Sequence, residues 1–439
     1  MVKLTIKFDM EDNKAMSHIV GKSAYKSLEE RLNRFPQGAP ASDTLYKILE
    51  VLFDEKEAEL VAQLPIKAFS IEKAAKIWGM KPIEAEKILN KLASRAILLD
   101  IEHEGKRTFM LPPPMAGFLE FSMMRTRGDV DQKLLAELYY QYLNVEEDFI
   151  KDLFYSSETK LGRVYVQEKV LTNDNSVEVL DYERASHIIK TASDIGISMC
   201  YCRHKMHHMG KACDSPMDIC MTFNTTASSL IKHGHAKKVD VSECLELLDL
   251  AYESNLVQCG ENVRKGVNFI CNCCGCCCEA MLAAKKFGVM HPVETTNFIA
   301  EVNKDTCVNC GKCIKKCPVG AIKNVVINKG TPMEKTVAEV DKDLCLGCGV
   351  CVRNCFNNSL MLKSRGKRVI TPATSVHRVV LMAIEKGQLS NLIFDNRALA
   401  SHRAMAAILS SILKLSPVKR AMASKQMKSV YLDKLIGGK

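Results

Sequence analysis

The chain has 439 residues, of which 47% are hydrophobic and 26% charged, values typical of a globular protein with two to four domains. No apolar signal-peptide core opens it, and nowhere do about eighteen apolar residues follow one another, so we expect a cytoplasmic protein rather than a secreted or membrane-spanning one. The net charge of +10 permits an acidic protein, a nucleic acid or a membrane surface as partner without choosing among them.

Residues 1–40 are expected to form an N-terminal segment that starts with a strand-like stretch and ends in a linker at 36–40. In residues 41–125, apolar side chains at helical spacing predict helices near 45–52, 70–79 and 85–96. Two strand-like runs follow at 97–101 and 107–111. This order resembles a winged helix, whose third helix reads DNA. Because Glu84 and Glu86 lie at the groove-entering end of that helix, we expect protein docking rather than DNA binding.

The region 126–298 is expected to form a mainly helical, cysteine-rich domain. All twenty cysteines of the chain fall between Cys200 and Cys355. Disulfides would be spread along the whole chain, whereas metal sites gather their ligands. The sequence therefore predicts that the cysteines bind metal.

Two copies of one cysteine motif occupy residues 307–355. Each copy has the spacing C-x2-C-x2-C-x3-C, and the two copies are Cys307-Cys310-Cys313-Cys317 and Cys345-Cys348-Cys351-Cys355. This doubled motif resembles the bacterial ferredoxins that hold two [4Fe–4S] clusters. Phe356 departs from that family, because proline usually follows the fourth cysteine.

The resemblance implies a ferredoxin-like domain over 299–365, with two strand–helix–strand units and a crossed set of ligands. The fourth cysteine of each motif binds the cluster of the other motif. Cluster 1 then takes Cys307, Cys310, Cys313 and Cys355, and cluster 2 takes Cys345, Cys348, Cys351 and Cys317. A pair of zinc knuckles is the alternative interpretation of the eight cysteines.

A second field of cysteines lies upstream, in residues 200–278. Thiolate-rich sites favour iron–sulfur clusters or zinc over harder ions. We expect a third iron–sulfur cluster, with a structural zinc site as the alternative. Its ligands are expected to be Cys200, Cys202, Cys213 and Cys220. Further ligands are expected among Cys271, Cys273, Cys274, Cys276, Cys277 and Cys278. We expect the neighbouring histidines not to be ligands.

The C-terminal part, 366–439, is predicted to be a basic, amphipathic helical tail. Such a helix packs on its own protein, docks on a partner protein or lies on an anionic membrane. The membrane alternative would place the protein peripherally at the inner face of the membrane.

The sequence thus predicts an α+β multidomain protein with iron–sulfur clusters that passes electrons between redox partner proteins. It resembles the large ferredoxin-like proteins of anaerobic bacteria. The sequence has no G-x-G-x-x-G loop, no Walker A motif and no nucleophile–base pair, so no catalytic residue and no cofactor besides the clusters is predicted. Two alternatives stay open. One is an iron–sulfur-sensing transcription regulator, and the other is a catalytic oxidoreductase with a substrate-binding cluster in 200–278.

Overall fold

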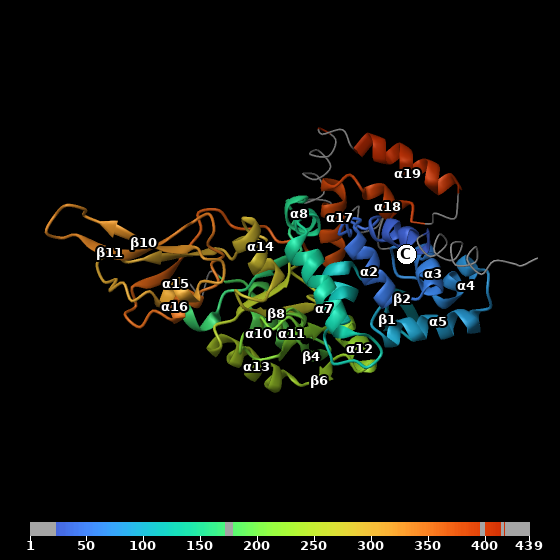
Figure 1. The fold of residues 1–439 in the computed structure, drawn as a ribbon, viewed down its shortest axis with the longest axis horizontal. Coiled ribbons are helices and arrows are strands. Elements are labelled where there is room, and N and C mark those ends of the chain that lie inside the picture. Colours follow the sequence, from blue (N-terminus) through green and yellow to red (C-terminus); the bar gives the residue numbers. More distant parts are fainter. Residues whose placement is uncertain (1–22, 172–178, 396–399, 414–416, 418–439) are drawn as a thin grey trace, which may run out of the picture.

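The computed structural model describes residues 23–171, 179–395, 400–413 and 417. The molecule is elongated (Figure 1). A helical N-terminal unit lies at one end, and the module that carries the doubled cysteine motif lies at the other. A sheet flanked by helices lies between them, and the C-terminal helices return to the N-terminal unit. The strand-like stretch expected near the N-terminus lies outside the described residues.

The N-terminal unit combines helices with a two-stranded hairpin. Residues 23–32 are helical. They are followed by α2 (Asp43–Leu52), α3 (Glu55–Gln63), α4 (Ile71–Trp78), α5 (Pro82–Ser94) and the antiparallel strands β1 (Leu99–His103) and β2 (Lys106–Met110). Side chains of Ser42, Asp54 and Ser70 cap the starts of α2, α3 and α4. The short, highly charged α3 was not anticipated from the sequence.

A six-stranded antiparallel sheet forms the centre of the molecule. Its strands, in spatial order, are β3 (Gly162–Val164), β7 (Val257–Glu261), β8 (Phe269–Cys273), β5 (Asp218–Phe223), β4 (Ile195–Met199) and β6 (Lys237–Lys238). A mainly helical domain was expected over 126–298, and this sheet is a departure from that expectation. Its middle strands contain cysteine, asparagine and glutamine where a half-buried strand usually shows alternating apolar residues.

Helices and short helical turns surround this sheet. The helices of the central region are α6 (Leu119–Phe121), α7 (Gln132–Tyr140), α8 (Asp148–Tyr155), α10 (Ala185–Thr191), α11 (Tyr201–His208), α12 (Asn224–Lys232), α13 (Val241–Glu253) and α14 (Glu279–Phe287). The turns are Pro114–Phe118, Gln141–Val145, Glu168–Val170 and Asp181–Glu183. Ile189 of α10 and Leu248 of α13 pack with Ile197 and Phe223 of the sheet in one apolar core.

The module at the far end has two strand–helix–strand units, the order expected from the ferredoxin resemblance. The first comprises β9 (Phe298–Val302), α15 (Lys312–Lys316) and β10 (Ile322–Ile327). The second comprises β11 (Lys335–Val340), α16 (Val350–Arg353) and β12 (Leu360–Ser364). β9 pairs with β12 and β10 pairs with β11, so strands of both units share each two-stranded sheet.

The first helices of the C-terminal tail pack on the protein itself. They are α17 (Ser375–Glu385) and α18 (Leu389–Ile393), followed by α19 (Ala400–Leu413). Ile384 and Leu392 share an apolar core with Ile66 of the N-terminal unit, and Asp395 accepts the Ile66 N–H at 2.6 Å. The basic residues after Pro417 lie outside the described residues. None of the helices in the described ranges is both long and apolar enough to cross a bilayer.

A buried carboxylate joins the hairpin of the N-terminal unit to the central region. Asp100 of β1 is 5% exposed and accepts four hydrogen bonds. The donors are Ser229 (2.7 Å), Lys232 (2.6 Å) and His233 (3.0 Å) at the end of α12, and Arg107 (2.8 Å) of β2. Burial alone would raise the pKa of Asp100, but these donors together hold it well below its ordinary value.

We predict that Asp100→Asn lowers the free energy of unfolding by about 2–3 kcal/mol, the scale of hydrogen bonds to a charged group. Because the folded pKa is depressed, the carboxylate stabilises the fold fully above about pH 4 and progressively less as the pH falls below it. Urea unfolding of both proteins in anaerobic buffer, at pH 7 and pH 3.5, measures this difference.

The matched control is Asp249→Asn, whose carboxylate pairs with Lys169 on the surface, where both side chains are about half exposed. Its loss should cost less than about 1 kcal/mol. Equal effects of the two substitutions at pH 7 would contradict the role given to Asp100.

Candidate metal centres

The eight cysteines of the doubled motif surround two small cavities of about 20 Å³ each. The first is lined by Cys307, Cys310, Cys313 and Cys355. The second is lined by Cys317, Cys345, Cys348 and Cys351. The fourth cysteine of each motif therefore faces the first three cysteines of the other. The two sets have the same members as the crossed ligand sets that the ferredoxin resemblance implies.

The chemistry of these two sites fits iron–sulfur clusters. Burial raises the pKa of the Cys348 and Cys351 thiols, so a thiolate at either position needs a cation beside it. Bound iron supplies that positive charge and deprotonates a coordinating thiol outright. Gly311, Gly347 and Gly349 all have positive φ, the conformation that the tight loops around the two cavities require.

The two cavities differ in their exposure to solvent. Cys310 is exposed in the first, whereas Cys345, Cys348 and Cys351 of the second are buried. Phe356, at the position where the family usually has proline, lines the first cavity and is 64% exposed. The first cavity is thus the outer site, and the second is the inner site, nearer the central sheet.

Seven upstream cysteines line one cavity beside the central sheet, each close enough to the next to change its pKa, and we call them the thiol row. Its order is Cys271, Cys220, Cys200, Cys202, Cys278, Cys273 and Cys259. Cys259 pairs with Cys271 across β7 and β8, and Cys273 is two residues further along β8. Because side chains alternate along a strand, these three thiols share a face of the sheet. From the sequence alone, Cys259 could be either a core residue or a ligand, since nothing in the sequence pairs its strand with β8.

Two members of the thiol row occupy the starts of helices. Cys200 is the N-cap of α11, and Cys278 is the N-cap of α14. Hydrogen bonds from neighbouring thiols, and then from backbone N–H groups of the first helical turns, lower the pKa of both thiols. The positive end of a helix favours a thiolate for the same reason.

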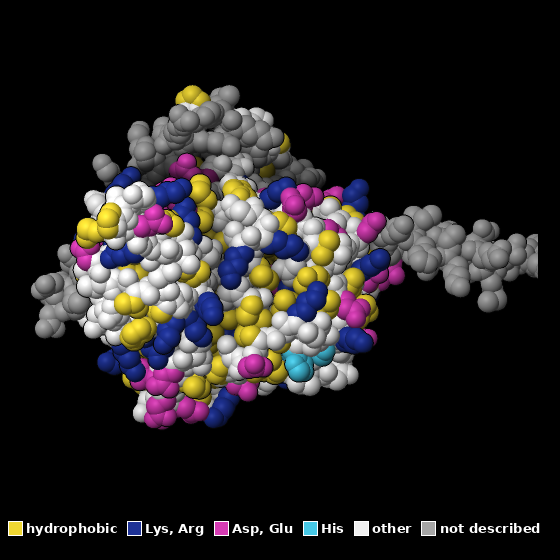
Figure 2. Space-filling view, turned by 60° about the vertical axis from the view of Figure 1, so that its left-hand side comes forward, with side chains coloured by type: hydrophobic (Ala, Val, Ile, Leu, Met, Phe, Trp, Pro, Cys, Tyr) yellow, Lys and Arg dark blue, Asp and Glu magenta, His cyan; other side chains and the backbone are white. Residues whose placement is uncertain are grey.

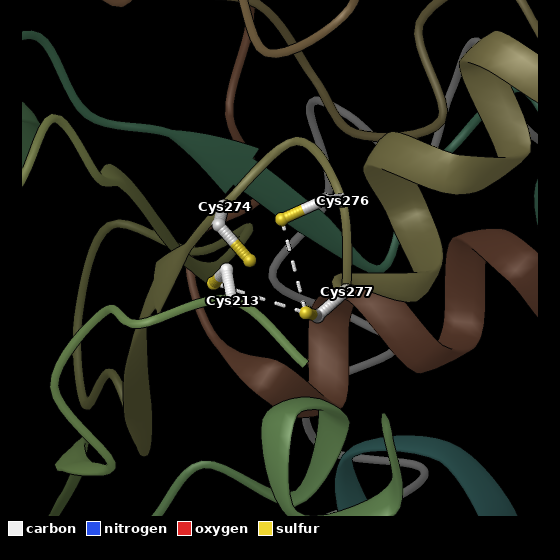
Figure 3. A group of neighbouring side chains, drawn as sticks. All are labelled: Cys213, Cys274, Cys276 and Cys277. Atoms are coloured by element: carbon white, nitrogen blue, oxygen red, sulfur yellow. Dashed lines mark hydrogen bonds between the residues drawn. The ribbon is translucent and has the colours of Figure 1, made fainter. Parts of the chain in front are cut away.

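The four cysteines expected to hold a third cluster are divided by the structure. Cys200, Cys202 and Cys220 lie in the thiol row, but Cys213 does not. Cys213 lies beside Cys274, Cys276 and Cys277, and the four Sγ atoms are all within 4.8 Å of one another (Figure 3). We call this second group the thiol quartet. The upstream field therefore contains two separate groups of cysteines.

Positive side chains are buried beside both groups. The Arg203 guanidinium, fully buried, donates to the carbonyl oxygens of Pro216 (2.6 Å) and Asn272 (2.7 Å). Lys205 is also fully buried and pairs with Glu279, the residue after Cys278. The hydrogen bond from Cys277, together with the Arg203 charge, lowers the pKa of Cys274 to about 5, against the effect of burial. Fixed positive charge thus offsets some of the thiolate charge.

Three histidines of this region form hydrogen bonds to groups other than cysteine. His204 Nδ1 lies 2.8 Å from the Met123 carbonyl oxygen, and His235 Nε2 lies 3.0 Å from the Ser94 carbonyl oxygen. His233 bonds to Asp100. Cys244, on α13, packs among apolar side chains, and burial raises the pKa of its thiol to about 12.

The family comparison agrees with the geometry of the end module. Residues 300–361 match the model of the 4Fe-4S dicluster domain. The match supports iron–sulfur clusters in this module and an electron-transfer role. It covers none of the upstream field, and no curated protein and no solved structure matches the chain significantly.

A large cavity opens beside the thiol row. Its volume is about 770 Å³, against about 20 Å³ for each ferredoxin-type site. All seven cysteines of the row line it, together with mainly apolar side chains from the N-terminal unit and α17. The Glu120 carboxyl also lines the cavity, and burial raises its pKa to about 8. Glu120 could not be predicted from the sequence, because a single glutamate in an apolar stretch carries no motif.

We predict that Gly347→Ala disrupts the inner site. An added Cβ would collide with the Phe298 carbonyl oxygen and the Thr296 hydroxyl, and the φ of +72° is unfavourable for alanine. The loop that carries Cys345 and Cys348 must shift, so the variant should lose about half of the iron of the end module, measured by iron analysis and EPR on reduced protein.

Gly311→Ala is the control at the outer site. Its φ is +69°, but its Cβ would meet no atom within 4 Å. The only cost is that of holding alanine at a positive φ, about 1 kcal/mol, so the iron content should stay unchanged. If Gly311→Ala lost iron and Gly347→Ala did not, the steric conflict expected at Gly347 would not be what disrupts a site.

Proposed function

We propose that this chain passes single electrons, at low potential, between redox partner proteins through two [4Fe–4S] clusters and at least one further cluster. The outer cluster is held by Cys307, Cys310, Cys313 and Cys355. The inner cluster is held by Cys345, Cys348, Cys351 and Cys317. The further cluster draws its ligands from the thiol row. The observation that carries this proposal is the position of the inner site between an exposed site and the row.

Contacts between the inner site and the thiol row support a continuous route. Cys259, Cys273 and Cys278 of the row share one apolar core with Cys345, Cys348 and Cys351. The Cys259 charge acts on the Cys348 thiol across this core. Electrons that enter at the exposed outer site therefore have a path inward through closely packed, water-excluded residues.

The surface around the outer site suits a partner with an acidic face. Lys312, Lys315 and Lys316 of α15 are exposed there, beside Val308, which is 59% exposed. The Lys312 ammonium lies 4.9 Å from the centroid of the exposed Phe356 ring. Figure 2, which brings this end of the molecule forward, has basic side chains spread among hydrophobic ones. Positive charge steers a redox protein with an acidic surface toward this site, and the exposed apolar side chains provide the contact area once it has bound.

Cysteine substitutions test the crossed ligand sets. If Cys355 binds the outer cluster, then Cys355→Ala and Cys310→Ser both lose the outer cluster and keep the inner one. Their EPR spectra in the reduced state should therefore be the same. Cys317→Ala and Cys348→Ser should likewise share one spectrum, that of the outer cluster. Each variant should lose about four irons per chain.

Cys244→Ala controls for the loss of a buried thiol outside any candidate site, and it should keep all of its iron. A Cys355→Ala spectrum that matches Cys348→Ser would overturn the crossed assignment. Iron limited to about eight atoms per unmodified chain would overturn the further cluster.

One observation favours a second function, a catalytic oxidoreductase. The cavity of about 770 Å³ would hold the cluster of the thiol row, and it extends beyond the cysteines to apolar walls formed by the N-terminal unit and α17, where a substrate could bind. A substrate bound there would meet a cluster on one wall and the Glu120 carboxyl, able to hold a proton near neutral pH, on another. An iron of that cluster must then be open to exogenous ligands.

Carbon monoxide and cyanide probe for such an open iron. In the catalytic case, carbon monoxide or cyanide shifts one EPR signal of the reduced holo-protein. The size of this shift should change near pH 8, where Glu120 loses its proton. Glu120→Gln should keep the shift and lose its pH dependence. Spectra that neither ligand changes would leave the chain as an electron carrier alone.

A further inference from the structure

The distances within the thiol quartet distinguish one metal ion from a cluster. The Cys276 and Cys277 Sγ atoms are 3.8 Å apart, and those of Cys277 and Cys213 are 3.9 Å apart. Four thiolates around a single zinc ion, with Zn–S bonds of about 2.3 Å, lie about 3.8 Å from one another at the corners of a tetrahedron. In a cubane each thiolate binds a different iron, so the sulfurs must lie farther apart. The quartet fits one ion.

The ferredoxin-type sites provide an internal comparison. Among the described residues, the quartet alone brings three or more potential metal-binding side chains within 4.8 Å of one another. The sulfurs of the outer and inner sites are more widely spaced than this, as thiolates around a cubane must be. The same chain therefore contains two kinds of cysteine group with different spacing.

The quartet also has the full ligand set of a closed structural site. Four thiolates complete a tetrahedral coordination shell and leave no open position. Cys277 and Cys274 are buried, Cys213 is half-buried and Cys276 is exposed, so an ion can enter from the Cys276 side. Arg203, whose charge acts on Cys213 and Cys274, offsets part of the double negative charge of a zinc tetrathiolate.

We propose that Cys213, Cys274, Cys276 and Cys277 bind a single tetrahedral metal ion, zinc by the closed tetrathiolate set, separate from every iron–sulfur cluster of the chain. The ion joins two segments distant in sequence: the loop after α11, which carries Cys213, and the turn between β8 and α14, which carries the other three.

The site has a mechanical role at the boundary with the end module. A Cβ on Gly275, inside this turn, would lie 2.8 Å from the Pro318 carbonyl oxygen and 3.0 Å from the Pro318 Cα. Backbone thus packs directly on backbone, and Pro318 follows Cys317 of the inner site. An ion that fixes the turn fixes the surface on which the inner site rests. The inference does not depend on the proposed electron transfer, because the ion count here and the ferredoxin-type EPR signals are separate readouts.

Metal analysis and zinc-edge X-ray absorption on the unmodified, anaerobically purified chain give the first test. We expect one zinc per chain with four sulfur neighbours at about 2.3 Å. Growth with iron in excess over zinc shows which of the two ions the site takes. A single iron in this site would give the high-spin EPR signal of a mononuclear iron tetrathiolate. That outcome would change the identity of the ion and still support a single-ion site. Absence of any mononuclear metal, or metal–metal scattering assigned to this site, would overturn it.

Variants locate the ion. Cys276→Ser, at the exposed position, should lose the zinc while keeping the iron and the EPR signals of the outer and inner clusters. Cys244→Ser is the matched control and should keep both metals. If Cys276→Ser folds poorly, cobalt replacement in the unmodified chain gives an independent readout, because tetrahedral Co²⁺ thiolate has intense visible absorption. Loss of several irons per chain in Cys276→Ser, with zinc unchanged, would place the quartet in a cluster instead and overturn the proposal.

Discussion

The structure depends on one electrostatic constraint: many thiol groups, which would bind metal as thiolates, are buried in water-poor surroundings. Burying an uncompensated anion costs several kcal/mol, so each thiolate needs positive charge close by. The chain provides it in three forms. Helix starts face Cys200 and Cys278, the charge of the buried Arg203 acts on Cys200 and on two cysteines of the quartet, and metal bound at the proposed sites would supply the rest. The central sheet serves this arrangement, because its pairing brings cysteines from distant segments onto one face.

The sequence was informative where the ligands are local. The doubled motif within 307–355 carries its own spacing, and the structure groups those eight cysteines in the sets expected from the family resemblance. The upstream field behaves differently, because its grouping follows from strand pairing. Cys259 meets Cys271 only through the register of β7 and β8, and Cys213 meets Cys277 across more than sixty residues of chain. Neither contact has a sequence signature, and strands such as Phe269–Cys273 lack the apolar alternation that would have revealed them.

The N-terminal unit shows a similar limit of pattern reasoning. Its hairpin follows the helices as expected, but α3 stands between the helices expected from the sequence, and basic side chains of α5 and the residue after it are engaged inside the unit. Lys91 and Arg95 both pair with Glu57, and Arg107 of the hairpin pairs with Asp100. Phosphate recognition needs basic groups that are free to release counterions. These three pairs use charge to hold the unit together, while Lys87 of α5 and Lys106 of β2 stay exposed.

The unequal exposure of the outer and inner sites has a consequence for survival in air. Dissolved oxidants reach exposed, thiolate-bearing positions first. With Cys310 exposed and Cys345, Cys348 and Cys351 buried, oxidative damage should begin at the tip of the molecule and spare the interior. A brief oxygen shock would then disconnect the chain from its partner while leaving the inner metal centres intact. Repair would require rebuilding one cluster at an accessible loop, without unfolding the central sheet.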